Sequence, residues 1–260
     1  MDQPIHRRRP TITPRDIASV FAIGWLTPYA LTIPFYYAII ILRNAAGGYG
    51  AGFDQILWGD SNQVGLTGVD YLWIAFILAC ELFAVFFFVI LPQRMTWRSF
   101  GLHRASNKWL YVAVLAIGLL ALIDEALLYY LKLTPEADAF LKSSLLPANP
   151  TITDLLVAIL VAGFAASFIE ELVFRGVMYR GLRTLLGIWP AAISSAALFS
   201  AVHMYFINPG GQYGWWMSGQ IFVFGLIAAI LLEKSGSLWP SIVMHTVANT
   251  GFVAFEFWVL

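Results

Sequence analysis

The sequence predicts an all-α fold, a polytopic transmembrane helical bundle of about seven spans with its N-terminus in the cytoplasm. Two observations carry this prediction. First, 60% of the 260 residues are hydrophobic and only 12% are charged, about half the charged fraction of a soluble domain. Second, the apolar residues come in blocks of about twenty, the length that an α-helix needs to cross a bilayer. The mean hydropathy of +0.75 agrees with both.

Seven apolar blocks can be marked along the chain. Tryptophan and tyrosine recur near their ends, as expected of side chains that anchor at the membrane interface. A basic start (Arg7, Arg8, Arg9) precedes the first block. That block is too long and too bulky for a signal-peptide core and no small-residue cleavage site follows, so we expect a retained helix. The predicted spans are Ile17–Leu42, Tyr71–Leu91, Trp109–Leu131, Ile152 to about Arg180, Ile188–Phe206, Gly214–Leu232 and Leu238–Val259.

The basic residues alternate from one predicted loop to the next. Of the 15 lysines and arginines, 12 fall on one side of the membrane, and only Arg43, Lys132 and Lys142 fall on the other. Cytoplasmic loops are enriched in basic residues, so we expect the N-terminus in the cytoplasm and the C-terminus outside. The twelve are Arg7, Arg8, Arg9, Arg15, Arg94, Arg98, Arg104, Lys108, Arg175, Arg180, Arg183 and Lys234.

Several functional classes are disfavoured. The formal net charge is zero, which gives no electrostatic argument for a nucleic-acid partner. Cys80 is the single cysteine, so a disulfide framework or a cysteine metal site is impossible. The glycine-rich stretch Gly47–Gly52 has no βαβ context and is expected to be a flexible outer connection rather than a phosphate loop. A proton-relaying transporter lacks support, because the sequence has no internal repeat.

Polar residues inside the predicted spans concentrate in the C-terminal half. An ionisable group inside a bilayer costs on the order of 2.5–3.5 kcal/mol by insertion scales, so each one needs a partner or a purpose. Glu81 is most simply a buried carboxyl, either neutral or hydrogen-bonded to another helix, while Asp124 and Glu125 lie nearer an outer interface. The C-terminal set is Glu170, Glu171, Arg175, His203, His245 and Asn249.

The spacing of this set is that of helix faces. Glu171 and Arg175 are four residues apart and so share a face, as expected of an ion pair. His245 and Asn249 are also four apart and project together. Glu170 is rotated by about 100° from Glu171 and is left to face a different neighbour.

The predicted turn near Gly187 brings two spans to the same depth. Glu170 lies 17 residues before this glycine and His203 lies 16 residues after it. In an antiparallel hairpin both side chains are then about 25 Å from the turn. Measured from Arg180, Glu170 is about 15 Å deep, and His245 is about 14 Å from its own helix start. Polar residues of three spans therefore converge on one layer.

Three short patterns in this order resemble a known family. They are EExxxR (from Glu170), FxxxH (Phe199 to His203) and HxxxN (His245 to Asn249). Together they resemble the type II CAAX prenyl endopeptidases and their bacterial relatives, the CPBP group of bacteriocin-processing and abortive-infection-type proteins. The resemblance divides the chain into residues 1–150, an N-terminal three-span membrane region, and residues 151–260, a CAAX-protease-like membrane core.

The resemblance implies peptide-bond hydrolysis within the membrane, with a role for each polar residue. Glu170 would be the general base that activates a water, and His203 would help to hold that water. His245 and Asn249 would donate hydrogen bonds to the developing oxyanion. No cofactor is then expected, and the partners would be the lipid bilayer and a peptide or membrane-protein substrate. The expected location is a bacterial plasma membrane.

Three residues would support this site. Glu171 and Arg175 are expected to serve mainly as scaffold, and Phe199 as packing that shapes the site. Two other functions stay open at this stage. A metalloprotease would place zinc on Glu170, His203 and His245, although the usual HExxH helix is absent. A non-catalytic membrane immunity or scaffold protein of the same family would instead bind a partner peptide or membrane protein.

The charge alternation predicts a testable topology. Single cysteines introduced in the Gly47–Gly52 and Pro209–Gly214 loops should react with a membrane-impermeant thiol reagent in intact cells. A cysteine introduced near Arg98 should react only after the cells are opened, because that loop is expected in the cytoplasm. Labelling near Arg98 from outside would overturn the predicted orientation.

Overall fold

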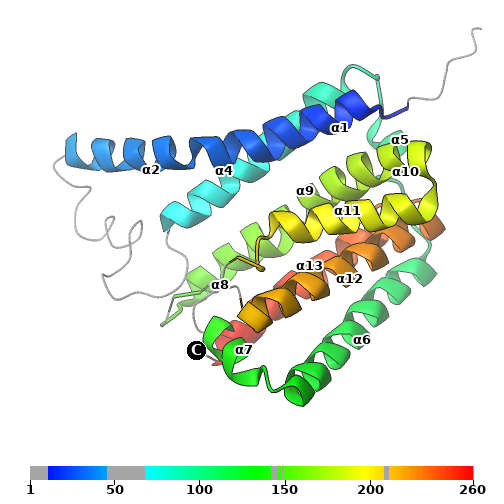
Figure 1. The fold of residues 1–260 in the computed structure, drawn as a ribbon. Helices are drawn as coiled ribbons and strands as arrows, with labels where there is room; N and C mark the ends of the chain where they lie inside the picture. Colours follow the sequence, from blue (N-terminus) through cyan, green and yellow to red (C-terminus); the bar gives the residue numbers. More distant parts are fainter. Residues whose placement is uncertain (1–10, 46–67, 142–145, 148, 208–210, 260) are drawn as a thin grey trace, which may run out of the picture.

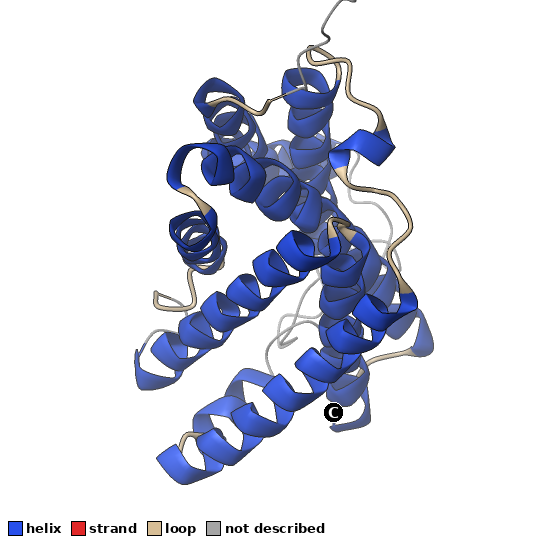
Figure 2. Ribbon diagram, turned by 90° about the vertical axis from the view of Figure 1, so that its right-hand side faces the viewer, coloured by secondary structure: helices blue, strands red, loops and turns tan. Residues whose placement is uncertain are grey.

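The computed structural model describes residues 11–45, 68–141, 146–147, 149–207 and 211–259. This part of the chain is built of helices and connecting turns, without a strand (Figure 2). Here η marks stretches with the wider π-type turn. The elements are α1 (Pro14–Phe21), η1 (Ala22–Leu26), α2 (Thr27–Ala45), α4 (Gly68–Val85), η2 (Phe86–Ile90), α5 (Trp97–Phe100), α6 (Asn107–Leu131), α7 (Thr134–Leu141), α8 (Ile152–Ala158), η3 (Ile159–Ala166), α9 (Ser167–Glu171), η4 (Leu172–Tyr179), α10 (Arg180–Leu186), α11 (Ile188–Val202), α12 (Gly211–Ser235) and α13 (Trp239–Val259).

The predicted all-α membrane bundle is confirmed. Within the described residues, four helical stretches are long and apolar enough to cross a bilayer: Asp70–Ile90, Asn107–Leu131, Ile152–Leu186 and Gly211–Ser235. The apolar helix Ile188–Val202 is shorter. The count of seven spans and the cytoplasmic N-terminus stay predictions, as does the division into residues 1–150 and 151–260. The stretch Gly47–Gly52 lies outside the described residues.

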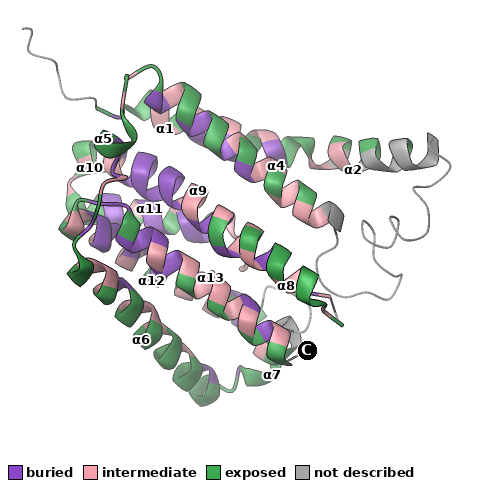
Figure 3. Cartoon of the chain, turned by 180° about the vertical axis from the view of Figure 1, so that it is seen from behind, coloured by how far each residue is buried: buried purple, intermediate pink, exposed green. Residues whose placement is uncertain are grey.

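The helices that carry the polar set form the middle of the bundle (Figure 1). The long stretch from α8 to α10 packs with α11 and α13, and α12 packs between α11 and α13. On one side α4 covers α9 and η4, and α1 covers η4. On the other side α6 packs on α13 and α12. All eight residues of η4 are buried. Figure 3 shows this buried region at the centre and the exposed surface of α6.

The predicted hairpin is confirmed, and its turn is at Gly187. This glycine has φ +85°, a left-handed conformation that a residue without a Cβ adopts freely, and it separates α10 from α11. The hydroxyl of Ser195 donates to the carbonyl oxygen of Phe174 at 2.9 Å. The rings of Phe174 and Phe199 meet edge to face, with centroids 5.0 Å apart. Residues equally distant from Gly187 therefore lie level, as the sequence predicts.

Basic residues at the predicted cytoplasmic end join separate segments of the chain. Arg180 of α10 donates to the carbonyl oxygen of Ser99 at 3.3 Å, which joins α10 to the α5 turn. Arg183 pairs with Glu233 near the end of α12 at 3.1 Å. Arg175 is an exception among the twelve residues assigned to this side. Its side chain is fully buried inside the bundle and adds no charge to a loop.

Candidate active site

The centre of the site is a buried ion pair. The guanidinium of Arg175 lies 3.0 Å from Oε1 of Glu171, and neither side chain has exposed surface. The predicted pairing of these two residues one helical turn apart is thereby confirmed. The guanidinium carbon also lies 4.3 Å from the ring centre of Phe199 and 6.0 Å from that of Phe224. Aromatic faces attract a cation, so Arg175 is held by one carboxylate and two rings.

His245 of α13 links this ion pair to Glu170. Its Nδ1 lies 3.1 Å from Oε1 of Glu171, and its Nε2 lies 3.8 Å from Oε2 of Glu170. A carboxylate accepts hydrogen bonds, so the contact with Glu171 places a proton on Nδ1. The ring is thus held by one glutamate with its second nitrogen directed at the other. Phe224 packs against it at 5.0 Å and Phe199 at 5.7 Å.

His203 is held in a similar way at the end of α11. The helix stops there, because the next residue, Met204, has φ +53°. Nδ1 of His203 lies 2.7 Å from the carbonyl oxygen of Phe199. A carbonyl oxygen only accepts, so Nδ1 carries the proton, and in the neutral ring Nε2 has a free lone pair. Both histidines are therefore anchored through Nδ1 and leave Nε2 for chemistry.

Glu170 is the least restrained member of the set. About 15% of its side chain is exposed, and its Oε2 has no hydrogen-bond partner among the described residues. The ring of Phe199 contacts both histidines, with its centroid 4.7 Å from that of His203 and 5.7 Å from that of His245. The structure thus brings Glu170, His245 and His203 into one cluster.

Asn249 lies one turn beyond His245, but its amide is engaged elsewhere. Nδ2 donates to the carbonyl oxygen of Ala162 at 2.9 Å and contacts the hydroxyl of Ser167 at 3.3 Å. Ala162 belongs to η3, where wide turns change the backbone pairing, and such turns are frequent at functional sites. Asn249 therefore joins α13 to η3, and one of its two contacts must open before the amide can bind anything else.

Sequence reasoning missed two contributors to this site. The ring of Phe224 of α12 meets that of His245 edge to face, and the hydroxyl of Ser167 accepts from Asn249. Ser167 lies four residues before Glu171 and so shares a helix face with it, which is a signal that the sequence contains. Phe224 is one of many aromatic residues in an apolar span and has no such signal.

The described residues contain no group of three or more His, Cys, Asp or Glu side chains arranged to hold a metal ion. Glu170, His203 and His245 are the three that the zinc alternative requires. The nitrogens Nε2 of both histidines are compatible with ligation. The expectation that no cofactor is needed stays a prediction.

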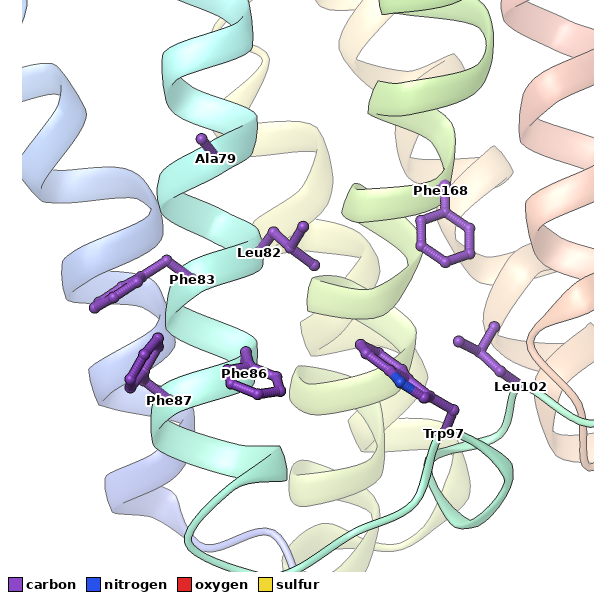
Figure 4. A pocket seen from close by; sticks show the side chains of 8 residues that line it. All are labelled: Ala79, Leu82, Phe83, Phe86, Phe87, Trp97, Leu102 and Phe168. Atoms are coloured by element: carbon purple, nitrogen blue, oxygen red, sulfur yellow. The ribbon is translucent and has the colours of Figure 1, made fainter.

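An apolar pocket of about 570 Å³ opens beside the site, between α4, η2, the α5 region and α9 (Figure 4). Aliphatic and aromatic side chains line it, among them Phe86, Trp97 and Phe168. Phe168 precedes Glu170 by two residues on α9. The pocket offers no acid, base or ligand for chemistry, but it provides apolar surface close to the helix that carries the free carboxylate.

The segment that carries these residues is similar to known proteins. Residues 152–251 match the family model described as type II CAAX prenyl endopeptidase Rce1-like. A protein of Escherichia coli described as "Uncharacterized 24.3 kDa protein" is 28% identical over 105 residues. The alignment covers 40% of this chain and 46% of the relative, so the similarity spans about half of the relative's length. No solved structure matches the chain significantly.

Replacing Arg175 by Met should lower the yield of folded protein. Removing one partner of a buried ion pair leaves an uncompensated charge and typically costs about 3–5 kcal/mol. The double change with Glu171→Leu should recover part of the loss, but not all, because His245 then loses its Nδ1 partner. Folded protein is measured by size-exclusion chromatography and thermal unfolding in detergent.

Arg183→Met is the matched control, because its pair with Glu233 is partly exposed. Exposed pairs contribute about 0–1 kcal/mol, so this variant should fold almost normally. If Arg175→Met were instead as stable as Arg183→Met but inactive, Arg175 would be a direct participant in the chemistry.

Proposed function

We propose that the protein is an intramembrane endopeptidase, because residues 152–251 match the Rce1-like family model of type II CAAX prenyl endopeptidases. It would hydrolyse a peptide bond of a membrane-associated protein or peptide in a bacterial plasma membrane. One observation carries the proposal: Glu170, with a carboxylate oxygen that has no hydrogen-bond partner, lies 3.8 Å from the free nitrogen of a histidine that is fixed by a second glutamate.

In the proposed reaction Glu170 acts as general base. It accepts a proton from a water held by the carboxylate and by Nε2 of His203. The water oxygen attacks the carbonyl carbon of the peptide bond, and the carbonyl oxygen becomes an oxyanion. Glu170 then passes the proton to the leaving amine nitrogen as the C–N bond breaks, so the carboxylate is regenerated. The atoms and protons of this hydrolysis balance with the protein and water alone.

His245 and Asn249 would stabilise the oxyanion. His245 would donate from Nε2 in the form of its ring that carries a proton on both nitrogens. Asn249 is neutral and can donate once its longer contact, with Ser167 at 3.3 Å, is exchanged for the oxyanion. The contact with Ala162 at 2.9 Å would meanwhile keep the side chain in place. Donors held in advance at the developing charge are the main source of such stabilisation.

The engaged amide of Asn249 also favours a second candidate function. If this amide never leaves Ala162 and Ser167, the site lacks one oxyanion donor, and the protein would act as a non-catalytic immunity or scaffold protein that binds a partner peptide. The two functions differ in their dependence on Glu170, because binding survives a neutral residue at that position and general base catalysis does not.

Glu170→Gln should therefore leave folding intact and reduce cleavage. Glutamine keeps the size and the hydrogen-bonding capacity of the side chain but cannot accept the proton, and loss of a general base typically costs about 10²–10⁴-fold in rate. Products are sought first by comparing the membrane proteomes of cells with wild type and with Glu170→Gln. A peptide found there is then tested with purified protein in liposomes, with and without a chelator.

Glu233→Gln is the control, since this carboxyl lies at the far end of α12 and pairs with Arg183. It should cleave at the wild-type rate, and a chelator should have little effect on any variant. Equal cleavage rates for wild type and Glu170→Gln would contradict the role of Glu170 as general base. Chelator inhibition that zinc reverses would establish the metalloprotease. A wild type that cleaves nothing but protects cells equally well with Gln at 170 would favour the scaffold.

Asn249→Ala should lower kcat by about 10²–10³-fold, the usual cost of one oxyanion donor. It should also destabilise the protein, because the carbonyl of Ala162 loses its partner. Ser167→Ala separates the two effects, since it removes only the contact that the oxyanion is proposed to replace. Its rate should stay within a few-fold of wild type in the same liposome assay. A comparable loss in both variants would show that Asn249 acts by holding Ser167.

A further inference from the structure

The mechanism leaves a buried acid of α4 unused. Glu81 lies in α4, its side chain is fully buried, and neither carboxyl oxygen has a hydrogen-bond partner among the described residues. A buried carboxylate without a cation or a donor is strongly unfavourable. Glu81 is therefore held as the neutral acid, and its O–H is a donor that needs an acceptor.

Close packing fixes Glu81 at this position. Gly24 of η1 lies against it, and a Cβ on this glycine would come within 3.3 Å of both the Cα and the Cγ of Glu81. On its other sides α4 packs against η3, α9 and η4, the helical stretch that carries the site. The side chain thus has little freedom to turn towards lipid, and it lies between the N-terminal helices and the catalytic core.

Glu81 lies on α4 and Glu170 on α9, and these two helices pack against each other. Glu170 has an oxygen without a hydrogen-bond partner, and Glu81 has an acid proton without one. One group therefore lacks a donor, the other lacks an acceptor, and both lie on helices that pack together.

We propose that Glu81 is a positioning residue for Glu170. As the neutral acid it donates its O–H to the Glu170 carboxylate through one water and holds that carboxylate in the orientation that activates the attacking water. This rests on the proposed role of Glu170 as the base. It gives the N-terminal half of the chain, which lies outside the family match at residues 152–251, a part in the reaction.

Two substitutions separate this role from packing. Glu81→Gln keeps a donor in place, and Glu81→Met keeps the volume but has none. Loss of a hydrogen bond to a charged group should lower kcat by about 10–100-fold in Glu81→Met with KM unchanged, whereas Glu81→Gln should stay within about 3-fold of wild type. If Glu81 served only in packing, Glu81→Met should have the higher kcat of the two variants, because a buried Met is better tolerated than a buried Gln. That order would overturn the proposal.

Infrared spectroscopy of the purified protein tests the pairing without any substrate. The difference spectrum of wild type minus Glu81→Gln should contain the C=O band of one neutral carboxylic acid. This band should shift in a Glu170→Gln background and stay unchanged in a background with Glu125→Gln, an exposed carboxyl on α6. The proposal would be overturned if the band were absent, or if its frequency were the same with Glu and with Gln at position 170. A shifted band in a protein that cleaves nothing would support the pairing while the proposed protease function failed.

Discussion

A single arginine without exposed surface lies at the centre of the bundle, and the balance of its charge determines where the other polar groups go. Glu171 neutralises Arg175 at 3.0 Å, and the rings of Phe199 and Phe224 cover the cation. A buried pair of this kind often contributes no net stability, since desolvation offsets the attraction. Its effect is to fix geometry: the carboxylate that it immobilises also holds Nδ1 of His245 and so directs Nε2 towards Glu170.

Around the site, some polar atoms hold a side chain in place while others of the same side chain stay free. Each histidine uses Nδ1 for attachment, one to a carboxylate and one to the carbonyl of Phe199, and keeps Nε2 free. Of the two adjacent glutamates, Glu171 contacts both Arg175 and His245 through Oε1, at 3.0 and 3.1 Å, whereas Glu170 has a longer contact of 3.8 Å with His245. Adjacent residues on a helix differ in direction by about 100°, so one helical turn can supply both a scaffold carboxylate and a reactive one.

The sequence predicted the contacts that follow from helix periodicity. It did not predict the contacts between side chains of different helices, which depend on how the helices pack. Four-residue spacing predicted the pair of Glu171 with Arg175, and counting from Gly187 predicted that two spans lie level, as the contact of Phe174 with Phe199 confirms. Spacing within one helix does not say which other helix a side chain meets. It could not show that His245 bonds Glu171, nor that the amide of Asn249 is held by Ala162 in a wide turn, which departs from the 3.6-residue repeat.

The N-terminal helices complete the environment in which this chemistry is possible. The family match begins at residue 152, yet η4, which carries Arg175, packs against α1 and α4 on one side and against α11 and α12 on the other. In the proposed mechanism the C-terminal segment would supply the reacting groups, while the N-terminal segment would cover the helix that carries Arg175 and would contribute Glu81. The site is therefore a property of the whole bundle.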